Sequence, residues 1–195
     1  MGIQDFKHLA FANGTTEVFD KFYMKHTGRR LRLWRGEYFY HQIVARESFD
    51  NNFAWIDEDE IRSNDVVVVS MPFSDTGNVV ENYEQIMTDC CKLNVPVLID
   101  MAYINISKHK QYNLEFDCIK TLATSLSKVF PVETYRIGMR MNRDNEDDTL
   151  NAYTNKITPY VTTHSINIAH QLIKEYPNSW VYDNYAMKQE ILCRE

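Results

Sequence analysis

The sequence predicts an α/β protein: a three-layer α/β/α sandwich around a mostly parallel sheet. Two unbroken apolar runs, Asp65–Ser70 and Val95–Ile99, are typical of strands buried on both faces of such a sheet. A helical pattern over Val79–Leu93 lies between them, so the three segments form a β-α-β unit. A length of 195 residues suits one sizeable core, and we expect residues 1–195 to form a single domain.

The first third of the chain alternates short strands and helices. A strand is expected at His8–Ala12, and after the turn Asn13–Thr16 a helix that is ended by Gly28. The next elements are expected to be a strand at Arg30–Trp34, a helix opening at Gly36–His41 and reaching about Arg46, and a strand at Phe53–Trp55.

The second half is predicted to complete the sheet and then turn helical. After a loop at 104–113 we expect strands at Phe116–Leu122 and Tyr135–Met141, and helices at Leu150–Ile157, Thr162–Glu175 and Asp183–Cys193.

The charge balance argues against a general nucleic-acid binder. The chain has 21 basic and 27 acidic residues and a net charge of −6. A basic cluster is formed by Arg29, Arg30, Arg32 and Arg35. Without a nucleic-acid motif beside it, we interpret this cluster as a solvated strand edge.

The cysteines and histidines suggest neither a disulfide framework nor a metal site. Cys90 and Cys91 are adjacent and poorly placed to pair with each other, and with Cys118 and Cys193 they show no metal-ligand spacing. No signal peptide or long apolar run is recognisable, so the sequence predicts a cytoplasmic protein without a membrane span.

The lysine in Thr124–Phe130 is the central candidate for chemistry. Lys128 follows an apolar segment and a hydroxyl-rich run, where partial desolvation would lower its pKa and allow a Schiff base with an aldehyde. By itself the pattern also fits an ordinary surface lysine. Similarly, Gly14 and Thr15 at a helix start fit either a phosphate cradle or a plain helix cap.

Six short motifs, in this order, together resemble the fold-type I pyridoxal-5′-phosphate enzymes of the aminotransferase class I/II family. They are Asn13-Gly14-Thr15-Thr16, Tyr38 in Gly36-Glu37-Tyr38, Ser74-Asp75-Thr76-Gly77, Asp100-Met101-Ala102-Tyr103, Ser125-Leu126-Ser127-Lys128 and Arg136-Ile137-Gly138. The resemblance covers residues 8 to about 175 and implies the large domain of such an enzyme.

The resemblance assigns catalytic roles to three residues. Lys128 would hold pyridoxal 5′-phosphate as a Schiff base and move a proton between substrate and cofactor. Asp100 would face the pyridine nitrogen and keep it protonated, and the alternative for Asp100 is a helix or loop cap. Tyr103 would hydrogen-bond the phenolate oxygen. Tyr38 would stack on the cofactor ring. A core aromatic role for Tyr38 is an equal alternative, and Tyr40 could take the stacking role instead.

The remaining assigned residues bind the cofactor's phosphate. Arg136 would clamp it with two parallel N–H bonds. The rest of the phosphate cup would come from Gly14, Thr15, Thr16 and Ser125.

The chain departs from the family pattern in two respects. Ser74 replaces the asparagine that contacts the phenolate oxygen, and Asp75 replaces a proline and puts a carboxylate near the cofactor. The family's usual N-terminal segment and C-terminal small domain, with its substrate-binding arginine, are not recognisable in this sequence.

The resemblance implies an aminotransferase that moves an amino group between an amino acid and a 2-oxo acid. The alternative is a truncated module that binds the cofactor but is inactive alone or needs a partner chain. A third option retains the cofactor and changes the reaction to decarboxylation, racemisation or carbon–carbon chemistry. We expect the chain to form a homodimer or to bind a partner chain. Four aromatic residues are candidates for the interface and could equally be core residues: Tyr153, Tyr160, Trp180 and Tyr182.

Overall fold

The computed structural model describes residues 2–50, 52–107, 112–130, 132–154 and 163–194. A seven-stranded sheet in the order β1-β7-β6-β5-β4-β2-β3 forms its centre. Six strands run in one direction, and β7 runs antiparallel to its neighbours β1 and β6. The strands are β1 (His8–Ala12), β2 (Arg30–Leu33), β3 (Phe53–Trp55), β4 (Asp65–Ser70), β5 (Val97–Asp100), β6 (Ile119–Ser125) and β7 (Gly138–Asn142). The predicted mostly parallel sheet is confirmed.

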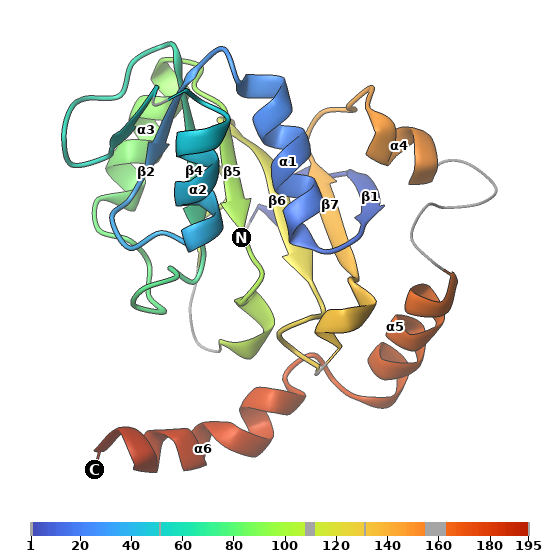
Figure 1. Ribbon diagram of the computed structural model, residues 1–195. Helices are drawn as coiled ribbons and strands as arrows, with labels where there is room; N and C mark the ends of the chain where they lie inside the picture. Colours follow the sequence, from blue (N-terminus) through green and yellow to red (C-terminus); the bar gives the residue numbers. More distant parts are fainter. Residues whose placement is uncertain (1, 51, 108–111, 131, 155–162, 195) are drawn as a thin grey trace.

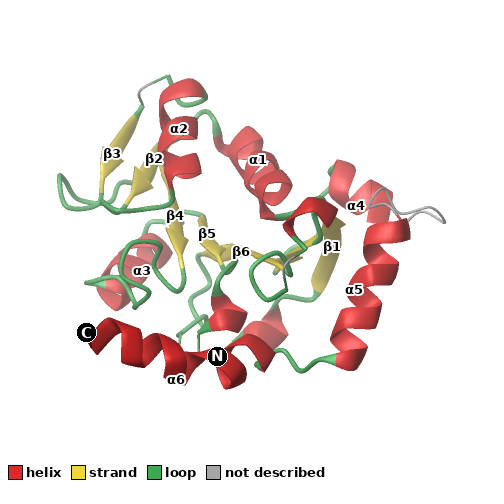
Figure 2. Ribbon diagram, turned by 60° about the horizontal axis from the view of Figure 1, so that its bottom comes forward, coloured by secondary structure: helices red, strands yellow, loops and turns green. Residues whose placement is uncertain are grey.

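Helices cover both faces of this sheet (Figure 2). The described α-helices are α1 (Thr15–His26), α2 (Phe39–Glu47), α3 (Tyr83–Lys92), α4 (Thr149–Thr154), α5 (Thr163–Glu175) and α6 (Trp180–Arg194). Val66 and Val68 of β4 pack towards α1 and α2, whereas Val67 and Val69 pack towards α3. All four side chains are fully buried, which is why β4 reads as a continuous β-branched run.

The strand directions bring distant parts of the chain to one edge of the sheet (Figure 1). The carboxyl ends of β1, β2, β4, β5 and β6 lie at this edge because these strands are parallel. Since β7 runs the other way, its first residue, Gly138, lies there too, paired with Ala12 and Ser125. Open α/β sheets bind their ligands at this edge.

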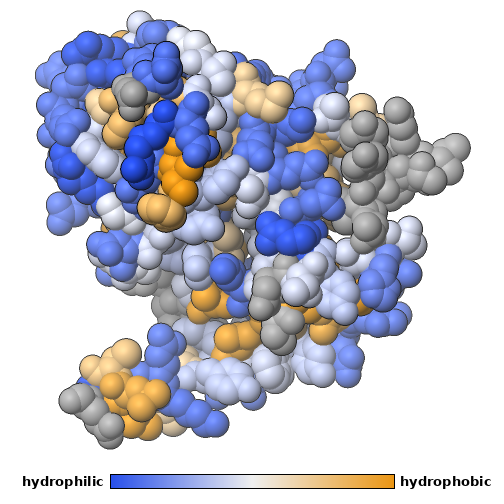
Figure 3. All heavy atoms as spheres, viewed as in Figure 1, coloured by the Kyte–Doolittle hydropathy of each residue, from blue (hydrophilic) through white to orange (hydrophobic). Residues whose placement is uncertain are grey.

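The last two helices differ in how they are packed. Ile168 and Leu172 of α5 pack against Val129 and Phe130, directly after the predicted catalytic lysine. Helix α6 extends from the body of the protein, and no residue of it is buried (Figure 1). Apolar side chains gather on it in Figure 3, and its exposed large apolar residues are Tyr185, Met187, Ile191 and Leu192.

Several boundaries differ from the sequence prediction. Helix α3 begins at Tyr83 rather than Val79, because Asn82 has a left-handed backbone (φ 58°) that interrupts a helix. Strand β7 begins at Gly138 rather than Tyr135, because a 3-10 turn at Glu133–Tyr135 and the left-handed Arg136 (φ 46°) precede it. Strand β6 runs three residues further than expected and ends at Ser125. Helix α6 begins at Trp180 rather than Asp183. The predicted end of the helix at Leu150–Ile157, the first residue of the helix predicted at Thr162–Glu175, and Tyr160 lie outside the described residues.

The basic cluster is not the solvated edge that the sequence predicts. Arg32 is fully buried, and its Nη1 lies 2.8 Å from Asp65 Oδ2 and 3.1 Å from Asp59 Oδ1. Arg30 pairs with the same two carboxylates, at 2.7 Å each. Sequence alone hides this network because Asp65 lies beside these arginines only once β2 and β4 pair. Arg35 alone fits the expectation, as its side chain is half exposed.

Candidate functional site

Most of the predicted site residues surround one cavity at the carboxyl edge of the sheet. This cavity has a volume of about 100 Å³. Its lining residues are Thr15, Thr16, Tyr38, Asp100, Ala102, Tyr103, Ser125, Ser127, Lys128 and Arg136. Four segments contribute to it: the start of α1, the loop before α2, the end of β5 with the loop after it, and the end of β6 with its connection to β7. Thr15 and Arg136 are 121 positions apart in the sequence. Ala102 and Ser127 are the lining residues that the sequence did not single out.

At one end of the cavity the Arg136 guanidinium lies beside the start of α1, where two glycines allow the backbone segments to pack closely. Gly14 has a φ of 85°, and the Arg136 guanidinium lies over it, so an added Cβ there would be 2.7 Å from Arg136 Cζ. Arg136 Nη2 also lies 3.5 Å from Thr16 Oγ1. Gly138 packs against Gly14 so closely that a Cβ on it would be 2.5 Å from the Gly14 carbonyl carbon. These two glycines allow Arg136 to reach the start of α1, where free N–H groups and a guanidinium suit an anion.

Lys128 lies in the turn that follows β6, held by the hydrogen bond from Val129 N–H to Leu126 O at 3.2 Å. Its Nζ is 5.3 Å from the centre of the Tyr103 ring. The side chain is exposed, so the expected partial desolvation is not present in this chain. Ser125 is buried beside it and closes the inner side of the cavity.

Asp100 belongs to a buried polar chain that the sequence analysis only partly foresaw. Its Oδ1 accepts a hydrogen bond from the Ala102 N–H at 2.9 Å, and its Oδ2 lies 3.6 Å from His41 Nε2. His41 is fully buried, and its Nδ1 lies 2.6 Å from the Tyr23 hydroxyl. Burial, first of all, raises the pKa of Tyr23 well above its ordinary value. The tyrosine therefore donates its proton to Nδ1, and the remaining N–H of His41 faces Asp100.

Glu37 is a second buried carboxylate beside this chain. Its Oε1 accepts hydrogen bonds from the Ser70 hydroxyl at 2.5 Å and the Tyr38 N–H at 2.9 Å, and its Oε2 accepts from the Ser70 N–H at 3.0 Å. Burial raises the pKa of Glu37, and His41 and these hydrogen bonds oppose the shift. Glu37 thereby fixes the backbone at Tyr38, whose ring lines the cavity.

Sequence reasoning missed Glu37 and His41 as site residues. The only signal was their spacing around Tyr38, since His41 follows it by about one helical turn. Tyr40, the rival for the stacking role, does not line the cavity; its hydroxyl donates to Asp20 instead.

Three residues that the sequence placed at the cofactor are not among the lining residues, and one of them is Gly14, which lies under the Arg136 guanidinium. Ser74 is exposed, and its N–H donates to Ser70 Oγ at 2.9 Å. Asp75 is exposed as well and lies against Gly36. The predicted contact between Ser74 and a cofactor stays a prediction.

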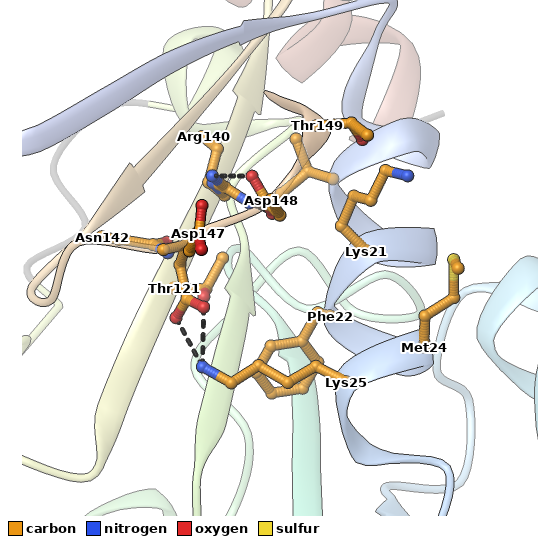
Figure 4. A pocket seen from close by; sticks show the side chains of 12 residues that line it. Lys21, Phe22, Met24, Lys25, Thr121, Arg140, Asn142, Asp147, Asp148 and Thr149 are labelled. Carbon is orange, nitrogen blue, oxygen red and sulfur yellow. Dashed lines mark hydrogen bonds and ion pairs between the residues drawn. The ribbon is translucent and has the colours of Figure 1, made fainter. Parts of the chain in front are cut away.

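A larger hollow of about 480 Å³ lies between the second half of α1 and the strands β6 and β7 (Figure 4). Four of its charged groups form two ion pairs: Lys25 lies 2.7 Å from Glu146, and Arg140 bonds Asp148. None of the predicted site residues lines this hollow. We therefore place the chemistry at the smaller cavity, where a lysine, a buried carboxylate and an anion-binding turn meet.

Within the described parts of the chain, no helix has the length and apolar character needed to cross a membrane. No protein-family model matches the sequence, and no curated protein matches it either.

Solved structures match the fold well. Aspartate aminotransferase from Thermotoga maritima has a TM-score of 0.73 at 12% identity, over 97% of this chain and 56% of that one. L-threonine-O-3-phosphate decarboxylase from Porphyromonas gingivalis has a TM-score of 0.68 at 16% identity, over 90% and 56%. A PLP-bound C-S lyase from Staphylococcus hominis has a TM-score of 0.68 at 14% identity, over 96% and 55%.

These similarities establish the fold of this chain. It is the α/β fold of the PLP-dependent aminotransferases, lyases and decarboxylases, as the sequence resemblance implied. The chain spans a little over half the length of the structures it matches.

Proposed function

We propose that this chain binds pyridoxal 5′-phosphate and uses it to transfer an amino group between an amino acid and a 2-oxo acid. One observation carries the proposal: an exposed lysine, a buried aspartate, a tyrosine and an anion-binding turn line the same small cavity. The residues are Lys128, Asp100, Tyr103, and Thr15, Thr16 and Arg136. The proposal includes a cytoplasmic location, as expected from the sequence.

The residues that line the cavity suit the charged groups of this cofactor, namely its phosphate and its ring nitrogen. The two glycines Gly14 and Gly138 leave room for the Arg136 guanidinium over the start of α1, which suits a phosphate. Asp100, 5% exposed, offers a carboxylate at the buried end, which suits a protonated ring nitrogen. Tyr38, whose backbone N–H is bound by Glu37, contributes an aromatic ring to the same cavity, and a ring face suits stacking on the cofactor.

The bound cofactor supplies an electron sink, and the protein's own groups do the rest. Lys128 Nζ would hold the cofactor and then carry a proton to and from the substrate carbon. Asp100 would hold a proton on the ring nitrogen. The Ala102 N–H donates to Asp100 Oδ1 and His41 Nε2 lies 3.6 Å from Oδ2, so the carboxylate is held in one orientation.

The alternative proposal is a module that binds the cofactor but turns over only with a partner. The exposure of Lys128 favours it. In this version a second copy of the chain, or a different chain, would cover the outer side of the cavity and supply contacts to the substrate.

Absorbance spectroscopy of the purified protein with added pyridoxal 5′-phosphate tests the binding step. We expect a visible band that shifts when the cofactor becomes bound to a lysine, and that borohydride reduction fixes to a peptide containing Lys128. Lys128→Ala should lose this band, whereas the matched control Lys120→Ala, on the opposite half of β6, should retain it. If both variants behave like the unmodified chain, the proposal is wrong.

A panel of amino acids and 2-oxo acids separates the possible reactions. Transamination predicts a new amino acid and a new 2-oxo acid in equal amounts. Carbon dioxide release or an inverted stereocentre would instead indicate one of the other reactions. Cofactor binding without any product, at all protein concentrations tested, would favour the partner-dependent module.

A further inference from the structure

Two cysteines from distant parts of the chain meet on the α3 side of the sheet. Cys91 lies in the last turn of α3, and Cys118 lies directly before β6. Their Sγ atoms are 2.7 Å apart, closer than the roughly 3.5–4.0 Å at which even smaller non-bonded carbon atoms rest. The Cys118 N–H also points at Cys91 Sγ, at 3.3 Å. The backbone on both sides thus already holds the two sulfurs face to face.

The two thiols differ in their exposure to solvent. Cys118 is buried, and its S–H lies 3.3 Å from the Met87 carbonyl oxygen. Burial, together with the Cys91 contact, raises the pKa of Cys118, so it stays a thiol at neutral pH. Cys91 is only partly buried, so a reagent in solution reaches it first.

The other two cysteines do not compete for this contact. Cys90 is fully buried, and burial raises its pKa to about 12, so its thiol is protonated and shielded. Cys193 is exposed on α6. Cys90 and Cys193 therefore serve as controls for thiol reactivity within the same chain.

We propose that Cys91 and Cys118 form a redox-active pair that closes to a disulfide in the presence of a small-molecule disulfide such as oxidised glutathione. The Cys91 thiolate attacks one sulfur of the small disulfide, which forms a mixed disulfide and releases one thiolate. Cys118 then loses its proton to solvent, attacks Cys91 Sγ and expels the second thiolate. The protein loses two hydrogens, and the small disulfide leaves as two thiols, so the step balances.

The cross-link joins α3 to β6 at the end of the strand that is remote from the candidate site. Cys118 precedes β6, whereas Ser125 and Lys128 lie at and beyond its other end, about 20 Å away for a strand of this length. Closing the disulfide should therefore constrain the unfolded chain between the two cysteines without altering the cavity. This prediction is independent of the proposed function.

The test exposes the reduced full-length chain to glutathione buffers of increasing oxidised fraction, followed by alkylation and intact mass spectrometry. We expect two of the four thiols to escape alkylation, a mass two hydrogens below that of the reduced chain, and a proteolytic peptide that joins Cys91 to Cys118. The melting temperature should rise by roughly 5–15 °C on oxidation and return with reductant.

Variants distinguish this pair from other thiol chemistry. Cys118→Ala should stop at the mixed disulfide, so Cys91 would retain one bound glutathione, and Cys91→Ser should show no reaction at Cys118. Cys193→Ser should form the cross-link as the unmodified chain does. The proposal is overturned if all four thiols stay free in the most oxidising buffer, or if fragmentation of the cross-linked peptide places the bridge on Cys90 or Cys193 instead of Cys91 and Cys118.

Discussion

Replacement of Gly138 by alanine tests how tightly the anion-binding turn is built. Gly138 opens β7 opposite Ala12, and a Cβ there would be 2.5 Å from the Gly14 carbonyl carbon and 2.7 Å from Gly14 Cα. All of these are backbone atoms, so no side chain can rotate away and the turn before α1 must shift. Overpacking of this kind costs about 1–3 kcal/mol, or a melting temperature lower by roughly 2–12 °C in a chain of this size.

The same shift should weaken cofactor binding, because Thr15 and Thr16 move with Gly14 relative to Arg136. A loss of about 1.4 kcal/mol is a tenfold weaker affinity, and we expect at least that. Urea unfolding and absorbance titration with pyridoxal 5′-phosphate measure the two effects. The control is Gly28→Ala, since a Cβ there has no atom within 4 Å; it should change stability by less than about 1 kcal/mol. Equal urea midpoints for the two variants would refute the packing argument.

Three further predictions concern buried charge, pH and the phosphate. Arg32→Met should destabilise the chain by roughly 3–5 kcal/mol in urea unfolding, because it leaves Asp65 buried with one partner fewer. Arg35→Met, at an exposed ion pair, should shift the urea midpoint far less. Burial lowers the pKa of His26 from 6.5 to about 4, so between these two pH values the unfolded chain binds a proton that the folded chain does not. The free energy of unfolding should therefore fall as the pH drops from 6.5 to about 4. Urea midpoints measured across this pH range should fall less in His26→Gln. Arg136→Lys should weaken cofactor affinity roughly tenfold in calorimetric titration with little change in unfolding, because lysine lacks the paired N–H fork; an unchanged affinity would contradict a phosphate role.

The sequence predicted the fold and the edge of the sheet well, for a physical reason. Strands β4 and β5 are buried on both faces, so their side chains are apolar from Val66 to Val69 and from Val97 to Ile99, and the polar residue that follows each run marks the carboxyl end of the strand. Asp100 was located in this way. Parallel strands then bring such ends together, whatever their distance in the sequence.

What the sequence could not give depends on contacts across the sheet. Glu37 looked like an ordinary polar residue, and its burial follows only from its bonds to Ser70, 33 positions away. Arg32 looked solvated for the same reason. The exposure of Lys128 was missed because the sequence of the turn after β6 does not show whether other parts of the chain cover the lysine.

That exposure leads to a last prediction about catalysis. Asp100 and Ser125 are 5% and 6% exposed, so the inner half of the cavity is shielded from water, whereas Lys128 and Tyr103 are exposed. Holding the cofactor needs contacts with Asp100, Lys128 and Arg136, and these contacts do not require the outer half of the cavity to be dry. Proton transfer by an amine at neutral pH requires a lowered pKa, which calls for a covered, drier outer half. If a second copy provides that cover, turnover per chain should rise with protein concentration, in step with the dimer fraction measured by analytical ultracentrifugation, while the cofactor's dissociation constant changes little. Full turnover at concentrations where the chain is monomeric would show that one copy is sufficient and that the lysine is activated in another way.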